Sequence, residues 1–96
     1  MTSINFLNDL ETIIKTRHAE MPEKSYTTQL FKAGKPRMLQ KIGEEAVETV
    51  IAGMADDLAS VKYEAADLIY HLMVYLESEG LSLGDIAVVL KDRHGK

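Results

Sequence analysis

Five acidic residues fall into two short groups whose spacing suits metal-dependent chemistry. Glu44, Glu45 and Glu48 lie in one segment of the chain, and Glu64 and Asp67 lie in the next. Residues three or four positions apart lie on the same face of an α-helix. If both segments are helical, each group therefore presents carboxylates that are within reach of a common ion.

The segment that follows Glu64 is apolar almost all the way round, which is unusual for a surface helix. At 100° per residue, Glu64, Asp67 and His71 fall within a sector of about 60°. The rest of the circumference is hydrophobic, so this helix is expected to be buried on most sides. Its polar stripe must then face a cavity, another polar stripe or a narrow strip of solvent.

The segment before it carries a second polar stripe, formed by Lys41, Glu45 and Glu48. Apolar residues lie on both flanks of this stripe: Ile42, Ala46, Val50 and Gly53 on one, and Val47, Ile51 and Met54 on or near the other. Both flanks need packing partners. A chain of 96 residues cannot supply all of them, so the pattern predicts a homodimer or a larger assembly.

If the two stripes face each other, the repulsion between their carboxylates must be relieved. Either the pKa values of the carboxyl groups rise or a cation is bound, and a divalent cation is the simpler solution. Oxygen ligands favour Mg²⁺, Mn²⁺ or Ca²⁺ over zinc or copper, and di-iron bundles use Glu-x-x-His pairs that this pattern lacks. Mg²⁺, with Mn²⁺ as a substitute, suits phosphoanhydride hydrolysis, with a remaining carboxylate as general base.

Hydrophobic periodicity predicts five helices and no strand in this chain. The expected helices span residues 3–20, 25–34, 36–55, 60–79 and 82–93. Ser25 and Ser82 are the expected N-caps of the second and fifth helices, and Gly34 and Gly80 are expected to stop the second and fourth. Short connections between helices favour antiparallel neighbours. We therefore predict an all-α antiparallel bundle of four to five helices, forming a single domain over residues 1–96.

Composition excludes several classes of protein. The chain has a net charge of −4, which argues against a nucleic-acid-coating protein, and it has no cysteine, which excludes disulfide scaffolds and thiol catalysis. No segment has the pattern of a signal peptide or a membrane span. We therefore expect a cytoplasmic protein that binds neither nucleic acid nor membrane.

Four cationic residues precede or adjoin the acidic groups: Lys32, Lys35, Arg37 and Lys41. The first three surround Gly34, where the start of a helix together with nearby cations favours an anion. They are candidate phosphate ligands, with ordinary solvation of a loop as the alternative. Lys41 is either an ion-pair partner of Glu45 or a phosphate contact, and the two roles are compatible as a substrate enters.

We also make predictions for the environments of three further residues, His71, Tyr70 and Gly43. His71 is either a buried histidine with satisfied hydrogen bonds or a substrate contact. Tyr70 faces away from the acidic stripe and is expected in the core or in an interface. Gly43 costs roughly 1 kcal/mol of helix propensity relative to alanine, which suggests that it permits a close approach between helices.

The motifs GEEAVE, at residues 43–48, and EAADLIYH, at residues 64–71, resemble those of the phosphoribosyl-ATP pyrophosphohydrolase family. The wider pattern of EExxE followed by ExxD resembles the all-α nucleoside triphosphate pyrophosphohydrolases, which include MazG and the helical dUTPases. With the segments at residues 26–31 and 80–85, the resemblance covers about residues 4–94.

This resemblance implies a MazG-like helical bundle that is packed as a homodimer. It implies Mg²⁺-dependent hydrolysis of phosphoribosyl-ATP to phosphoribosyl-AMP and pyrophosphate, the second step of histidine biosynthesis. By position, Glu45, Glu48, Glu64 and Asp67 match the metal-site motif, and Glu44 is the expected general base. A separate cyclohydrolase is then expected to act next in the pathway.

Two alternatives remain open from the sequence. The first is a housecleaning hydrolase of non-canonical nucleotides, which has the same metal site and a different pocket. The second is a non-catalytic helical assembly module whose acidic stripes are merely solvated. The sequence leaves open the number of metal ions, the identity of the base, the phosphorus that is attacked and the choice between dimer and tetramer.

Overall fold

The computed structural model describes residues 2–95, and this part of the chain is helical with short connections and no strand. It comprises a 3₁₀ helix, η1 (Thr2–Asn5), and five α-helices: α1 (Phe6–Glu20), α2 (Tyr26–Ala33), α3 (Lys35–Met54), α4 (Leu58–Ser78) and α5 (Leu83–His94). The all-α prediction is confirmed. None of these helices is both long enough and apolar enough to cross a membrane.

The helix ends follow the signals in the sequence. The Ser25 hydroxyl accepts a hydrogen bond from the Thr28 amide at the start of α2, and Gly34 ends that helix with a φ of 93°. Ser82 and Asp85 form a reciprocal capping box at the start of α5. Each of these devices satisfies a backbone group that has no partner within its helix.

Two helices begin two or more residues away from their expected starts. The first four described residues form η1, so α1 starts at Phe6. Helix α4 starts at Leu58, two residues before the predicted start, because Asp57 is its N-cap. The Asp57 carboxylate accepts hydrogen bonds from both the amide and the hydroxyl of Ser60, at 3.1 and 2.8 Å.

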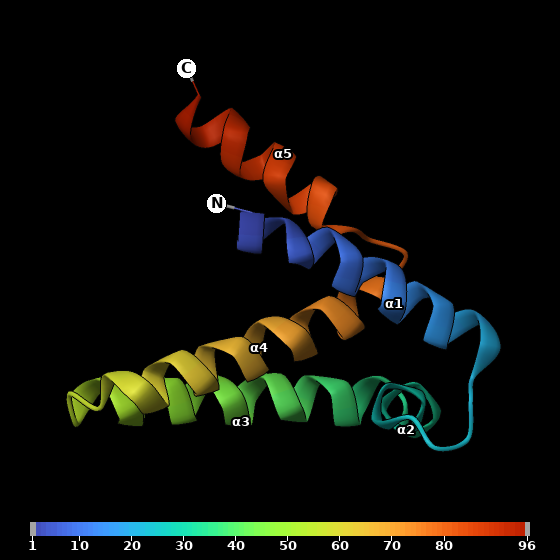
Figure 1. Cartoon of the computed structure of the whole chain (residues 1–96), viewed down its shortest axis with the longest axis horizontal. Helices are drawn as coiled ribbons and strands as arrows, with labels where there is room; N and C mark the ends of the chain where they lie inside the picture. The colour runs from blue at the N-terminus through green and yellow to red at the C-terminus, as the bar shows by residue number, and fades with distance from the viewer. Residues whose placement is uncertain (1, 96) are drawn as a thin grey trace.

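Helices α3 and α4 form an antiparallel hairpin, and the other helices are arranged around one end of it (Figure 1). Helix α1 crosses the C-terminal half of α4, and the short α2 lies beside the start of α3. Helix α5 leads away from the hairpin on the side of α1, and none of its residues is buried. The bundle is therefore closed only near the α2 end of the hairpin.

The hydrophobic core lies where α1, α2, α3 and α4 meet, and its buried members are Ile14, Leu30, Met38, Met73 and Val74. The opposite half of the hairpin has no such cover. Large apolar side chains remain exposed there: Val47, Val50, Ile51, Met54, Leu58 and Tyr63. On the predicted apolar flanks of the acidic stripe, the described part of the chain thus leaves Val47, Val50, Ile51 and Met54 exposed, whereas Ile42 and Ala46 are partly buried.

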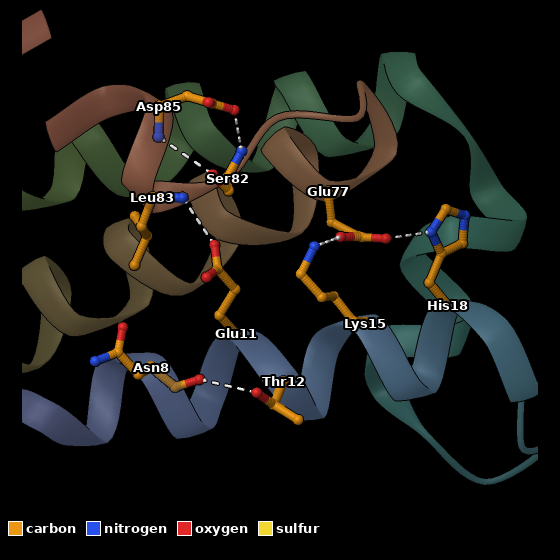
Figure 2. A network of polar contacts seen from close by, with 9 residues as sticks. All are labelled: Asn8, Glu11, Thr12, Lys15, His18, Glu77, Ser82, Leu83 and Asp85. Carbon is orange, nitrogen blue, oxygen red and sulfur yellow. Dashed lines mark hydrogen bonds and ion pairs between the residues drawn. The ribbon is translucent and has the colours of Figure 1, made fainter. Parts of the chain in front are cut away.

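Polar contacts fix α1 to the end of α4 and to the start of α5 (Figure 2). Glu77 accepts a hydrogen bond from Lys15 at 3.2 Å and pairs with the His18 ring at 2.9 Å. The Glu11 carboxylate accepts a hydrogen bond from the Leu83 amide at 2.7 Å. These contacts join positions that lie far apart in the sequence, and they set the direction in which α5 leaves the bundle.

The neighbouring residues Ile13 and Ile14 provide a matched test of the core. Ile14 is 1% exposed and Ile13 is 39% exposed. We expect Ile14→Ala to lower the free energy of unfolding by about 2–5 kcal/mol, because it leaves a cavity, and Ile13→Ala by less than about 1.5 kcal/mol. Denaturant unfolding followed by circular dichroism measures both, and equal losses would contradict this placement of the core.

Candidate active site

Three of the predicted carboxylates converge between α3 and α4. Glu45 and Glu48 project from α3 and Glu64 from α4, and one carboxylate oxygen of each lies within 4.8 Å of the others. The two polar stripes therefore do face each other, as the sequence predicts. Three like charges at this separation repel strongly unless a proton or a cation is shared among them.

Burial makes this repulsion more severe. Glu45 is only 6% exposed, although it is ionisable. One oxygen of Glu45 and one of Glu64, both Oε1, are buried without a hydrogen-bond partner. An unsatisfied buried acceptor is costly, and oxygen ligands in this number suit Mg²⁺. The donor set therefore fits a divalent cation.

The pKa of Glu64 is raised to about 7. The largest cause is the hydrogen bond that a protonated Glu64 can donate to Glu48, followed by burial and by the neighbouring Glu45. Without a cation, this group therefore holds a proton at slightly acidic pH. A bound cation would replace that proton, since both relieve the same repulsion.

Lys41 is the cation closest to this cluster that the structure records in an ion pair. Its ammonium lies 3.3 Å from Glu44 Oε1 and 3.4 Å from Glu45 Oε2. Burial disfavours its charge, but Glu44, Tyr26 and Glu45 outweigh burial and raise the pKa of Lys41. The predicted ion pair with Glu45 is confirmed, and the phosphate contact stays a prediction.

Glu44 lies at the edge of the cluster, and 42% of its side chain is exposed. Gln40 donates a hydrogen bond to its carboxylate at 2.9 Å. Gln40 and then Lys41 lower the pKa of Glu44, so the group is ionised at neutral pH. It is therefore a carboxylate outside the three-membered cluster that is able to accept a proton.

Asp67 does not join the cluster, although it follows Glu64 by one helical turn. It is exposed, and it is absent from the group of three carboxylates that approach within 4.8 Å. Its backbone carbonyl instead accepts a hydrogen bond from the Nδ1 of His71 at 2.7 Å. A role for Asp67 as a metal ligand stays a prediction.

His71 is 6% exposed, and both of its ring nitrogens have partners. A carbonyl can only accept, so Nδ1 donates to the Asp67 carbonyl and Nε2 accepts from the Tyr26 hydroxyl at 3.0 Å in the neutral ring. His71 is thus a satisfied, buried histidine that ties α2 to α4. The next residue back, Tyr70, is partly buried against the core and bonds to the Thr27 hydroxyl, as expected for a residue facing away from the acidic stripe.

The three cations around Gly34 lie on exposed positions, as either of their predicted roles requires. Lys35 forms an ion pair with Glu79 at 2.9 Å, at the end of α4. Lys32 and Arg37 are exposed, and the charge of Arg37 contributes to the lowered pKa of Glu44. The structure does not place these side chains within the carboxylate cluster, and a role in phosphate binding stays a prediction.

Two hollows adjoin Glu48, on either side of its position on α3. One, of about 260 Å³, lies between the helices and is lined by Glu48, Glu64, Ile51, Ala52, Ala55, Asp57 and Ser60. The other, of about 590 Å³, is a more open groove along α3, lined by Gln40, Gly43, Glu44, Val47, Glu48 and Ile51. Together they give the cluster room for a ligand much larger than a metal ion.

The space around Gly43 is open within the described chain. A Cβ built at this position meets no atom within 4 Å, so within the described chain no helix approaches it closely. The expectation of tight packing at Gly43 is therefore wrong for the single chain. The small residue instead leaves the groove beside Glu44 wide.

Residues 7–94 match the family described as phosphoribosyl-ATP pyrophosphohydrolase. This chain belongs to that family. The match spans both acidic groups and all of the five α-helices except the first residue of α1, so the resemblance found in the sequence motifs is confirmed.

Relatives in this family support the same conclusion. The chain is 50% identical over 90 residues to the histidine biosynthesis bifunctional protein HisIE of Bacillus subtilis, covering 94% of this chain and 43% of that protein. It is 48% identical over 89 residues to the HisIE of Xanthomonas axonopodis, covering 93% of this chain and 43% of that protein. The chain therefore spans less than half the length of these relatives.

The raised pKa of Glu64 predicts how the stability of the metal-free protein depends on pH. A folded pKa above the unfolded value means that the folded state holds its proton more tightly. The contribution of this proton to the stability of the fold is then fully present below about pH 4.5, and it is lost as the pH rises through about 7. Thermal unfolding in chelator should show the midpoint falling between pH 5 and 8, and Glu64→Gln should flatten this fall. A midpoint that rises over this interval would contradict the assignment.

Proposed function

We propose that this chain hydrolyses phosphoribosyl-ATP to phosphoribosyl-AMP and pyrophosphate with Mg²⁺, in the second step of L-histidine biosynthesis. The observation that carries the proposal is the cluster of Glu45, Glu48 and Glu64, with two buried oxygens lacking partners, in a member of this family. A cytoplasmic location is part of the proposal, and a cyclohydrolase would act on the product.

The proposed ligands for the cation are Glu45, Glu48 and Glu64. Asp67, which lies outside this cluster, is the proposed fourth ligand. A bound Mg²⁺ would neutralise phosphate charge and acidify a bound water. The antiparallel packing of α3 and α4 holds the first three carboxylates in place before any cation arrives. Mn²⁺ is the expected substitute, because it accepts the same oxygen ligands.

Glu44 is the proposed general base. Its lowered pKa keeps it ionised, and its exposed position leaves it free of the carboxylate cluster. The wide groove beside Gly43 gives a substrate access to this carboxylate. Gln40 and Lys41 fix the orientation of the Glu44 side chain through hydrogen bonds.

Phosphate binding is assigned to four cations. Lys41 adjoins the cluster directly, whereas Lys32, Lys35 and Arg37 lie around the junction of α2 and α3. A substrate with a triphosphate and a separate ribose phosphate carries anionic groups at two ends. Cations at two places, around the junction of α2 and α3 and beside the acidic cluster, therefore match its charge distribution.

We also propose that two copies of the chain pack together through the uncovered half of the α3–α4 hairpin. Val47, Ile51, Met54 and Leu58 are between 58% and 82% exposed. Exposure of so many large apolar side chains on adjoining turns is typical of a surface that is buried in an assembly. Because Ile51 lines both hollows beside Glu48, such packing would also cover the candidate site.

A housecleaning hydrolase of other nucleotides is the alternative with the same metal chemistry. Substrate choice separates the two, since the proposed enzyme should release pyrophosphate from phosphoribosyl-ATP in preference to ATP or dUTP. A non-catalytic assembly module would act on none of them.

Pyrophosphate release tests the activity and the roles of two glutamates. With Mg²⁺, wild type should turn over phosphoribosyl-ATP, and EDTA should abolish turnover. Glu48→Gln should lower kcat/KM by at least about 100-fold, through the loss of a ligand charge. Glu44→Gln should lower kcat about 100-fold or more while Mn²⁺ affinity stays near that of wild type, as expected for a general base. Full activity of Glu48→Gln, with a circular dichroism spectrum like that of wild type, would contradict the proposed role of the carboxylate cluster.

Sedimentation equilibrium tests the assembly. We expect wild type to sediment as a dimer or larger species at micromolar concentration. Met54→Asp should shift it toward monomer, since it places a charge in the proposed apolar interface. Lys91→Asp, an exposed change on α5, serves as the control. A wild-type monomer at all concentrations would contradict the proposed packing.

A further inference from the structure

The Lys41 ammonium lies where it must compete with a cation for Glu45. The two oxygens of Glu45 have different surroundings. Its Oε2 lies 3.4 Å from Lys41 Nζ, whereas its Oε1 is buried without a hydrogen-bond partner. The same carboxylate belongs to the cluster with Glu48 and Glu64. One carboxylate therefore belongs both to an ion pair and to the candidate metal site.

We propose that Lys41 is an exchangeable counter-ion of this site: it pairs with Glu45 while the metal is absent and turns to the phosphates of the substrate when the metal binds. This inference rests on the proposed function, and it adds a role that links metal entry to substrate binding. Lys41 is a positioning residue in this role until it contacts the substrate.

Electrostatics favour such an exchange. Glu45 is 6% exposed and needs a counter-charge when it is ionised, and Lys41 is the residue that the structure places beside it. A divalent ion held by Glu45, Glu48 and Glu64 would repel an ammonium that shares the Glu45 carboxylate. The pair with Lys41 must therefore weaken as the ion binds.

The lysine side chain is suited to move. Its ammonium is a compact point charge on a flexible four-carbon stem, so it can change partners without a shift of the backbone. Only 18% of the Lys41 side chain is exposed, and its second partner, Glu44, lies at 3.3 Å on the side of the open groove. Release from Glu45 thus leaves the ammonium held by Glu44, next to the hollow in which a substrate would lie.

Mn²⁺ binding to the purified chain, without substrate, tests the competition by calorimetry. Lys41→Met should bind Mn²⁺ roughly three- to tenfold more tightly than wild type, or about 0.7–1.4 kcal/mol. Lys41→Arg keeps the charge and should remain close to wild type. Lys15→Met is the matched control, because Lys15 also pairs with a glutamate, Glu77. That pair lies thirteen residues along α4 from Glu64, about 20 Å away, where the charge is largely screened.

The second arm measures pyrophosphate binding to the same proteins with saturating Mn²⁺. Lys41→Met should bind pyrophosphate at least about fivefold more weakly than wild type, although it holds the metal more tightly. Opposite changes in the two affinities are not expected of a lysine that only stabilises the fold. Unfolding curves in chelator establish that the variants are folded, and Lys41→Gln replaces Lys41→Met if the latter is not.

The outcomes separate the inference from the proposed function. Mn²⁺ that binds wild type but binds Lys41→Met equally or more weakly overturns the exchange and leaves the metal site intact. Unchanged pyrophosphate affinity in Lys41→Met overturns the transfer to phosphate. Failure of Mn²⁺ to bind wild type removes the metal site, and with it both the exchange and the proposed function.

Discussion

The mutual repulsion of Glu45, Glu48 and Glu64 is the constraint on which the rest of the structure depends. Three carboxylates within 4.8 Å of one another, one of them almost fully buried, destabilise any fold that brings them together. The raised pKa of Glu64 and the Lys41 ammonium beside Glu45 each relieve part of this repulsion. Neither gives a partner to the buried Oε1 atoms of Glu45 and Glu64, which a divalent cation would satisfy.

Burial of apolar side chains in the hydrophobic core offsets the free-energy cost of this carboxylate repulsion. Buried side chains of α1, α2, α3 and α4 hold the α2 end of the hairpin together, and the acidic residues lie further along α3 and α4. The pair of long helices then carries the carboxylates outward on rigid backbone. A site on helices is held more precisely than one on loops, which explains why the acidic groups lie within α3 and α4 and not in their connections.

Helix α2 connects the core to the site. The bond from the Tyr26 hydroxyl to His71, and the bond from His71 to the Asp67 carbonyl, run from α2 to the turn of α4 that follows Glu64. Tyr26 also contributes to the raised pKa of Lys41. The same short helix thus touches the core through Leu30 and the polar site through its first residue. This helix of eight residues therefore contributes both to the hydrophobic core and to the hydrogen bonds beside the candidate site.

The sequence by itself determined the presence of five α-helices, the N-caps of α2 and α5, and the family of this protein. Spacings of three and four place Glu45 with Glu48, because such residues share a face of a helix whatever the fold. Capping residues such as Ser82 and Asp85 act within one turn, so their effect is also readable locally. The GEEAVE and EAADLIYH motifs indicated membership of the family, and the match over residues 7–94 confirmed it.

Only the tertiary structure decided which of these residues meet. It brought Glu64 to Glu45 and Glu48 but left Asp67 exposed, since the angle between two packed helices depends on side chains along their whole length. It also revealed the bond between Tyr26 and His71, which are 45 positions apart and share no local pattern. The close approach expected at Gly43 is absent within the described chain, because helix propensity reports a cost without showing what fills the space. Contacts between distant residues arise from packing of the whole chain, and no short spacing encodes them.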